Sequence, residues 1–252
     1  MLLRPTHPLL TIALAVGAAL SLSPQSLISQ PPPDPQADFI HRIDLSVAAR
    51  FQSLAGYTVQ EHYSIYRNAD TAPAAEMTVA VVYTPEHGKQ YTPISQSGSE
   101  IFRHLIFDKI IASERDMNLA SARAGYFINS TNYQMQVPAE TVLRNGRPCY
   151  LVTLKARRKS PYLFDGKAWF DSADASIVRL EGTPTEPSSF LTANTVVARD
   201  YTSLQGISMA TRAQANTRTF LFGDTILKID YLDYHLQLAP AALPEAISVP
   251  RR

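Results

Sequence analysis

The sequence is poor in the residue types on which several kinds of functional site depend. Its 252 residues include one cysteine, Cys149, which excludes an intramolecular disulfide, a cysteine-based zinc site and an iron–sulfur cluster. Only 10 glycines occur, and none forms a Walker loop or a dinucleotide-binding fingerprint. Charged residues make up 18%, with 23 Lys and Arg against 22 Asp and Glu. Nucleic-acid-binding proteins usually carry a strongly basic surface, so this balance argues against that class.

Motifs for catalysis and for metal binding are also missing. The stretch Ser95–Glu100 lacks the first glycine of the Gly-x-Ser-x-Gly elbow of hydrolases. The histidines are scattered, and none belongs to a His-Glu-x-x-His pair. The acidic residues and the histidine within 230–235 are better explained as a polar strand edge than as a metal site. We therefore expect a protein that is not an enzyme and that needs no cofactor and no metal.

The two ends of the chain differ from its middle. The apolar run Leu9–Leu20 has the length of a secretory signal and is short for a membrane span of about 20 residues. We predict a cleaved signal peptide over 1–23 and a periplasmic or secreted protein; an uncleaved N-terminal membrane anchor is the alternative. Prolines mark a linker over 24–37 and a disordered tail over 239–252. Residues 38–238 remain for the folded domain.

Two segments of this domain have helical periodicity. Apolar residues recur every three or four positions over Asp38–Leu54, which predicts an amphipathic helix. A second helix is predicted over Ser99–Arg115. Its apolar face is wide, so we expect it to be covered on most sides.

Most of the remaining domain has the pattern of β-strands. Alternating apolar residues separated by turn residues predict about eight to ten strands in one large antiparallel sheet. The strongest turn signal is Asn145-Gly146, which predicts a hairpin with a type I′ turn. Helices do not alternate with buried strands, so the pattern predicts an α+β fold rather than a doubly wound one. The strands are expected over 57–66, 76–84, 126–137, 148–156, 163–171, 176–181, 195–202, 207–215 and 219–238.

One predicted hairpin can be placed in register. If Trp169 lies opposite Arg179, then Lys167 lies opposite Glu181. These cross-strand pairs predict a cation–π contact and an ion pair on one face of the hairpin. The opposite face is then apolar and consists of Ala168, Phe170, Val178 and Leu180.

The same hairpin carries a resemblance to a known family. Gly166–Asp171, followed by Ile177–Gly182, resembles the W-x-D and I-x-R-x-E hairpin of outer-membrane lipoprotein carrier proteins. Their superfamily includes the carrier, its lipoprotein receptor and periplasmic regulators of envelope stress. The later stretch from Pro187 through Arg212 to Lys228–Tyr231 is similar to that superfamily as well.

The resemblance implies an incomplete β-barrel whose large curved antiparallel sheet wraps around helices. In that family, the apolar hollow holds acyl chains or a partner segment. The hollow would be lined by the helix and by inward strand residues, with a permanently closed core as the other interpretation. The candidate ligand-binding residues are Val79, Val81, Ile101, Phe102, Leu105, Ile106, Ile110, Val152, Phe170 and Leu180.

The leading hypothesis is an exported, non-enzymatic protein that binds a lipid, a lipoprotein or another apolar ligand in the half-barrel. Its partners would be lipid or lipoprotein acyl chains, and its process could be lipoprotein sorting at the outer membrane. The alternative is a cell-envelope module that senses or binds a protein partner and has no ligand cavity. Neither hypothesis involves nucleic acid.

Overall fold

The computed structural model describes residues 34–68, 70–187, 195–219 and 223–240. The predicted signal peptide over 1–23 and most of the predicted linker and tail lie outside these ranges. The helical elements are α1 (Pro35–Ser53), α2 (Glu100–Phe102), a π-helical segment (Arg103–Phe107), α3 (Asp108–Asn118) and a 3₁₀ turn (Arg123–Tyr126). The strands are β1 (Leu54–Arg67), β2 (Ala75–Thr84), β3 (Gly88–Gly98), β4 (Tyr133–Gln136), β5 (Val142–Arg144), β6 (Arg147–Ala156), β7 (Phe164–Asp171), β8 (Ile177–Pro184), β9 (Val196–Leu204), β10 (Ile207–Thr219) and β11 (Gly223–Leu238).

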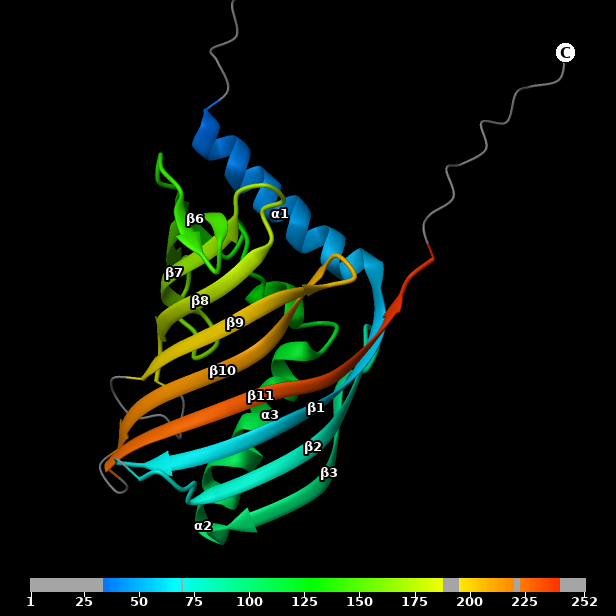
Figure 1. Ribbon diagram of the computed structural model, residues 1–252. Coiled ribbons are helices and arrows are strands. Elements are labelled where there is room, and N and C mark those ends of the chain that lie inside the picture. The colour runs from blue at the N-terminus through cyan, green and yellow to red at the C-terminus, as the bar shows by residue number, and fades with distance from the viewer. Residues whose placement is uncertain (1–33, 69, 188–194, 220–222, 241–252) are drawn as a thin grey trace, which may run out of the picture. The chain divides into compact units, whose positions relative to one another are not determined.

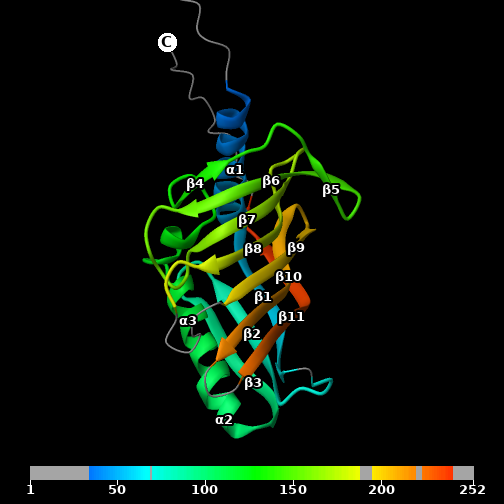
Figure 2. The same cartoon turned by 90° about the vertical axis from the view of Figure 1, so that its left-hand side faces the viewer.

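All described strands belong to one antiparallel sheet that curves without closing (Figure 1). The strand order is β3-β2-β1-β11-β10-β9-β8-β7-β6-β4, and β5 pairs with β6. The sheet bends around the segment from α2 to α3, which lies on its concave side (Figure 2). The predicted α+β half-barrel is therefore confirmed.

The predicted Asn145-Gly146 turn and the predicted register are confirmed. Asn145 and Gly146 have φ angles of 51° and 77°, as a type I′ turn requires at both central positions. Trp169 lies opposite Arg179, and Lys167 lies opposite Glu181. The apolar face of this hairpin is buried as expected.

The side-chain partners in this hairpin differ from the prediction. The guanidinium of Arg144, on the neighbouring hairpin, lies 4.9 Å from the centre of the Trp169 ring. Arg179 instead forms ion pairs with Glu181 on its own strand, at 2.5 Å, and with Asp200 on β9, at 2.6 Å. Backbone register does not determine these contacts, because long side chains reach diagonal neighbours and neighbouring strands as well.

Two strands were not predicted, and one predicted strand is largely wrong. The edge strand β3 has no apolar alternation beyond Tyr91 and contains Pro93, which lies at a β-bulge opposite Val79. Edge strands tolerate proline and polar residues on both faces, so the pattern of β3 was hidden. The short strand β5 was also missed. The predicted strand over 126–137 is wrong except for β4, because a 3₁₀ turn and a loop held by the buried Asn132 precede it.

The second predicted helix is present but contains a π-helical segment. The backbone N–H of Asp108 donates to the carbonyl of Arg103, five residues earlier. In a regular α-helix, Phe102 and Phe107 would lie about 140° apart around the axis. The π-turn brings both rings into the interior, where Phe102 is 4% and Phe107 is 0% exposed. The expectation that this helix is covered on most sides is wrong, because the side opposite these rings faces solvent.

The concave side of the sheet holds two separate hydrophobic cores. In the first core, α2, the π-helical segment and α3 pack on β1–β3, β10 and β11. In the second core, Phe39 and Ile43 of α1 pack on β4 and β6–β8. Helix α1 begins at Pro35, inside the predicted linker, where Asp34 caps it by accepting a hydrogen bond from the Gln36 N–H. One sheet thus supports two cores, each with its own helix.

The second core depends on a close backbone approach in β7. Gly166 lies opposite Gly182 on β8, and a Cβ at Gly166 would come within 2.1 Å of the Glu181 carbonyl oxygen. Gly166 lies within β7, away from any turn. Only glycine fits there.

We therefore expect Gly166→Ala to lower the free energy of unfolding by about 2 kcal/mol, because the added methyl group forces the two strands apart. Chemical denaturation measures this change. The matched control is Gly125→Ala, where the added Cβ meets only the flexible end of Arg158. Equal stability of the two variants would contradict the close approach.

Candidate functional site

A partly open cavity of about 640 Å³ lies between the two cores. Its walls are the C-terminal half of α1, the adjacent ends of β1, β2, β10 and β11, and the turn that joins β7 to β8. Leu54, Tyr57 and Met209 reach it from the first core, and Phe170 and Ala175 reach it from the second. The cavity is therefore the part of the concave face that neither core fills.

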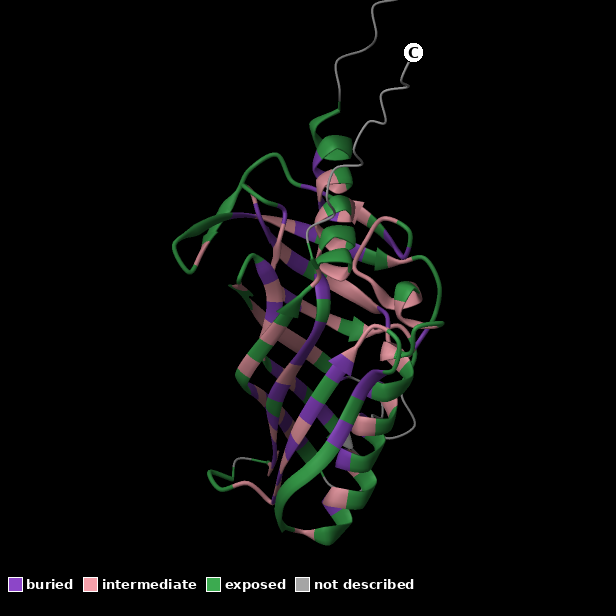
Figure 3. Cartoon of the chain, turned by 90° about the vertical axis from the view of Figure 1, so that its right-hand side faces the viewer, coloured by how far each residue is buried: buried purple, intermediate pink, exposed green. Residues whose placement is uncertain are grey.

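Helix α1 packs closely on the sheet only in its N-terminal half, and its C-terminal half spans the cavity. Its buried residues are Phe39 and Ile43, in the N-terminal half, whereas the C-terminal half is half-buried or exposed (Figure 3). Leu45, Ser46 and Ala49 of that half line the cavity. The amphipathic helix predicted from the sequence thus packs into the second core with its N-terminal half and lines the cavity with its C-terminal half.

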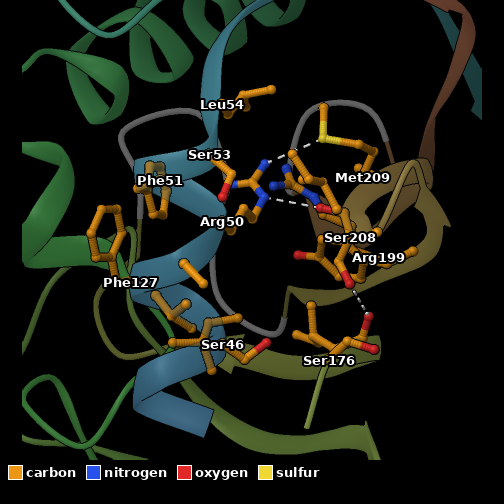
Figure 4. Close-up of a pocket in the computed structure, with 18 of the residues that line it drawn as sticks. Ser46, Arg50, Phe51, Ser53, Leu54, Phe127, Ser176, Arg199, Ser208 and Met209 are labelled. Atoms are coloured by element: carbon orange, nitrogen blue, oxygen red, sulfur yellow. Dashed lines mark hydrogen bonds between the residues drawn. The ribbon is translucent and has the colours of Figure 1, made fainter. Parts of the chain in front are cut away.

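Hydrogen bonds from two arginines attach α1 to the sheet and its turns at the rims of the cavity. The guanidinium of Arg42 donates to the carbonyls of Ser172 and Ala173, at 3.1 and 2.6 Å, in the turn after β7. Near the other end, Arg50 Nε donates to the Ser208 carbonyl at 2.9 Å (Figure 4). These two contacts tie the helix to both sides of the cavity.

A stacked aromatic pair connects α1 to the segment after the 3₁₀ turn. The rings of Phe51 on α1 and Phe127, after the 3₁₀ turn, have centroids 3.9 Å apart (Figure 4). Both residues line the cavity and are half-buried. They add apolar surface at the position where a ligand would meet α1.

A network of buried charges forms the floor of the cavity. Lys89 Nζ, on β3, donates to Glu61 Oε1 at 3.1 Å and to Glu114 Oε2 at 2.7 Å. Arg199, on β9, donates to the other Glu114 oxygen at 3.1 Å. The hydroxyl of Tyr63 donates to Glu61. Each carboxylate thus has cationic or hydroxyl donors, as burial of a charge requires.

These contacts set the protonation state of Glu114. Burial raises the pKa of its carboxyl, but Lys89 and Arg199 outweigh burial and lower the pKa from 4.5 to about 2. Burial alone would lower the pKa of the Lys89 ammonium, but Glu114 and Glu61 raise it well above its ordinary value. Glu114 and Lys89 therefore stay ionised at neutral pH. The network connects α3 to β1, β3 and β9.

A smaller cavity of about 150 Å³ lies between α3 and strands β8–β11. Its lining is almost entirely apolar and includes Ile110, Leu180 and Leu227. Glu114 and Arg199 line both cavities, so their ion pair stands between the larger cavity and the smaller one. The Arg199 side chain is the more exposed of the two, at 35% against 8% for Glu114.

The predicted ligand-binding residues are divided among four places. Ile101 and Leu105 lie on the solvent side of the helix, 60% and 46% exposed, and face neither cavity. Phe170 lines the larger cavity, and Ile110 and Leu180 line the smaller one. The others pack within the cores: Val79, Val81, Phe102 and Ile106 in the first, and Val152 in the second.

The polar side chains of the site were missed by the sequence analysis. The sequence indicated one of them. Glu61 lies on the same face of β1 as Tyr57, Val59 and Tyr63, all of which are buried. A carboxylate on an apolar strand face indicates a buried partner of opposite charge. Lys89, on the unpredicted strand β3, and Arg199 had no such signal in the sequence.

The described residues were compared with the requirements of a metal site and of a membrane span. Nowhere in 34–68, 70–187, 195–219 and 223–240 do three His, Cys, Asp or Glu side chains gather in a way that could hold a metal ion. Among the helices of these same ranges, none is long and apolar enough to span a bilayer.

We expect Glu114→Gln to lower the free energy of unfolding by about 3 kcal/mol at neutral pH, because it leaves Lys89 and Arg199 partly unpaired. A carboxyl whose pKa is lowered by folding stabilises the fold above pH 4.5, and this contribution is lost as the pH falls towards about 2. The variant should lack that part of the acid dependence.

Denaturation curves at a series of pH values provide the measurement. Asp230→Asn is the control, because the ion pair of Asp230 with Arg212 lies on the surface and contributes under about 1 kcal/mol. If native protein and Glu114→Gln lose stability in parallel on acidification, the charge network does not stabilise the fold.

No family model matches the sequence. One curated protein is similar over a part of the chain: glucan endo-1,3-beta-D-glucosidase 2 of Saccharomyces cerevisiae is 31% identical over 108 residues. The match covers 41% of this chain and 12% of the yeast protein. The chain thus spans about an eighth of that relative's length.

Solved structures are similar over most of the chain. A putative outer membrane lipoprotein-sorting protein domain from Vibrio parahaemolyticus is 13% identical with a TM-score of 0.47, and the match covers 81% of this chain and 93% of that one. A DUF1329 family protein from Desulfovibrio piger is 12% identical with a TM-score of 0.42, over 83% and 96%. A LolA superfamily protein from Nitrosomonas europaea is 11% identical with a TM-score of 0.40, over 82% and 96%.

These similarities concern the fold, and at such identities the function has to be argued from this chain's own residues.

Proposed function

We propose that the protein is an exported, non-enzymatic binding protein that holds the apolar part of a lipid or lipoprotein in the larger cavity. Its place of action is the cell envelope, reached through the predicted signal peptide over 1–23, and its process is the handling of lipoproteins there. The single observation that carries this proposal is the cavity between the two cores, which the fold leaves unfilled.

The size and the lining of the cavity support a ligand of this kind. Ligand sites usually measure about 300–1,000 Å³ and are lined mostly by apolar and aromatic side chains. The volume of about 640 Å³ lies within that range. The apolar side chains that face it include Phe51, Leu54, Phe127, Phe170 and Ile177.

The position of α1 supports the same proposal. Collapse of the helix onto the sheet would bury apolar surface, at a gain of roughly 25 cal/mol for each Å². Arg42 and Arg50 hold the helix to the rims of the cavity instead. The apolar surface beneath the helix is therefore available to an acyl chain, and binding of that chain would bury the surface that the helix leaves exposed.

The protein-sensing module is the second candidate, and it requires no ligand cavity. The presence of the cavity supports the lipid-binding proposal over this alternative. Exposed large apolar side chains, such as Leu143 on the β5–β6 hairpin, are common on protein surfaces and do not by themselves indicate a docking site.

We expect Ala49→Trp to weaken the binding of an apolar ligand about tenfold or more, because the indole would occupy part of the cavity. Ala49 lies on the exposed part of α1 and lines the cavity, so the larger side chain can be accommodated without disturbing either core. Titration with the neutral fluorescent probe N-phenyl-1-naphthylamine measures the affinity.

Ala48→Trp is the matched control. Ala48 is the adjacent residue of α1, is exposed as well and does not line the cavity. Native protein and this control should bind the probe alike. Absence of probe binding to the native protein, or equal binding by both tryptophan variants, would contradict the proposed function.

A further inference from the structure

We infer that the ligand carries an anionic group, and that Arg50 and Arg123 bind this group at the wall of the larger cavity. The inference rests on the proposed function and extends it, because it names the chemical class of the ligand as an anionic amphiphile. It is argued from the charges of the lining, from the hydrogen bonds of the two guanidinium groups and from the adjoining apolar surface.

The lining of the cavity carries more positive than negative charge. Its carboxylates are those of Glu114 and Asp174. Its cations are Arg42, Arg50, Lys89, Arg123 and Arg199. An excess of one charge sign in a cavity with low-dielectric walls attracts ligands of the opposite sign.

The buried network neutralises part of this charge internally. Lys89 and Arg199 contact Glu114, and Lys89 also contacts Glu61 behind the cavity wall. Two cations are thus balanced by two carboxylates. Arg42, Arg50 and Arg123 remain, against the exposed carboxylate of Asp174, and none of the three arginines forms an ion pair with a carboxylate of the described residues.

Arg50 has hydrogen-bonding capacity that the protein does not use well. Its Nε–H donates to the Ser208 carbonyl, and this bond fixes the direction of the guanidinium. One terminal nitrogen faces the thioether sulfur of Met209 at 3.7 Å, and a thioether is a weak acceptor. The other terminal nitrogen has no acceptor among the described residues. An oxyanion would bind these nitrogens far more strongly than the sulfur does.

Arg123 approaches the same cavity from the segment after α3. Its guanidinium donates to the Pro85 carbonyl and to the Tyr83 hydroxyl, the latter at 3.4 Å. Both partners are neutral, so the charge of Arg123 is not compensated by them. Arg42 differs from this pair, because one of its terminal nitrogens already donates to two carbonyls of the β7–β8 turn.

The apolar surface begins next to Arg50. Phe51 follows it in the sequence, with the guanidinium carbon 4.9 Å from the ring centroid, and Phe51 stacks on Phe127. A cation beside an aromatic wall suits a molecule that has an anionic group at one end and a hydrocarbon chain at the other. Neither a purely apolar ligand nor a free inorganic anion would use both parts of this wall.

The test compares ligands that share one chain and differ in charge. Dodecyl phosphate, dodecanol and inorganic phosphate are each titrated against protein loaded with N-phenyl-1-naphthylamine, below the concentrations at which the amphiphiles form micelles. In native protein, dodecyl phosphate should displace the probe at about tenfold lower concentration than dodecanol, because it adds charge-assisted hydrogen bonds. Added salt should reduce this difference.

The variants identify the residues responsible. Arg50→Gln should bring the two concentrations close together. Arg123→Gln should reduce the difference as well, and it lies on another element, so it serves where Arg50→Gln weakens the attachment of α1. The matched control is Arg212→Gln on β10, which lies outside the cavity and should behave as native protein does.

Three results would overturn the inference. The first is equal displacement by dodecyl phosphate and dodecanol in native protein, which would leave the apolar cavity of the proposed function intact. The second is an unchanged preference for the phosphate in both cavity variants. The third is displacement by inorganic phosphate alone at the same concentration, which would identify a site for free anions. Failure of dodecanol and dodecyl phosphate alike to displace the probe would instead count against the proposed function.

Discussion

The structure depends on one constraint: the concave face of the curved sheet is larger than the area that its helices cover. An eleven-stranded sheet that bends without closing presents a long concave face, and a helix is only about 10 Å in diameter. The segment from α2 to α3 covers one part of this face, and the N-terminal half of α1 covers another. The two cores that result do not meet. The larger cavity is the part of the concave face between them, and its location follows from the length of the sheet rather than from any catalytic motif.

Polar contacts maintain this arrangement, since hydrophobic burial alone would favour closing the gap. Arg42 and Arg50 attach α1 to opposite rims of the cavity. On the floor, the charge network around Glu114 ties α3 to three strands. A buried ion pair stabilises a fold less than apolar packing of the same volume would, so its retention here agrees with a role in fixing geometry. The same network separates the larger cavity from the apolar one beneath α3.

Prediction from the sequence succeeded where local rules decide the structure. The Asn145-Gly146 turn, the pairing of Trp169 with Arg179 and both long helical segments follow from turn chemistry and from apolar periodicity. It failed where tertiary contacts decide. The edge strand β3 is polar on both faces, and the π-turn becomes apparent only when Phe102 and Phe107 have to face one sheet. The candidate lining was a list of apolar residues, yet most of these fill the cores. The arginines that face the cavity carry no distinctive pattern, because in sequence an arginine on a helix resembles any solvated side chain.

The central claim is that the hollow between the two cores is where a ligand binds. Photo-crosslinking with a fatty acid that carries a diazirine on its chain, followed by peptide mapping, tests it most directly. The account predicts crosslinks to the C-terminal half of α1 and to the start of β10, at residues such as Ser53 and Ala210, and their loss when unlabelled fatty acid competes. Crosslinks confined to the solvent side of the helix, at Ile101 and Leu105, or to the convex face of the sheet would contradict it.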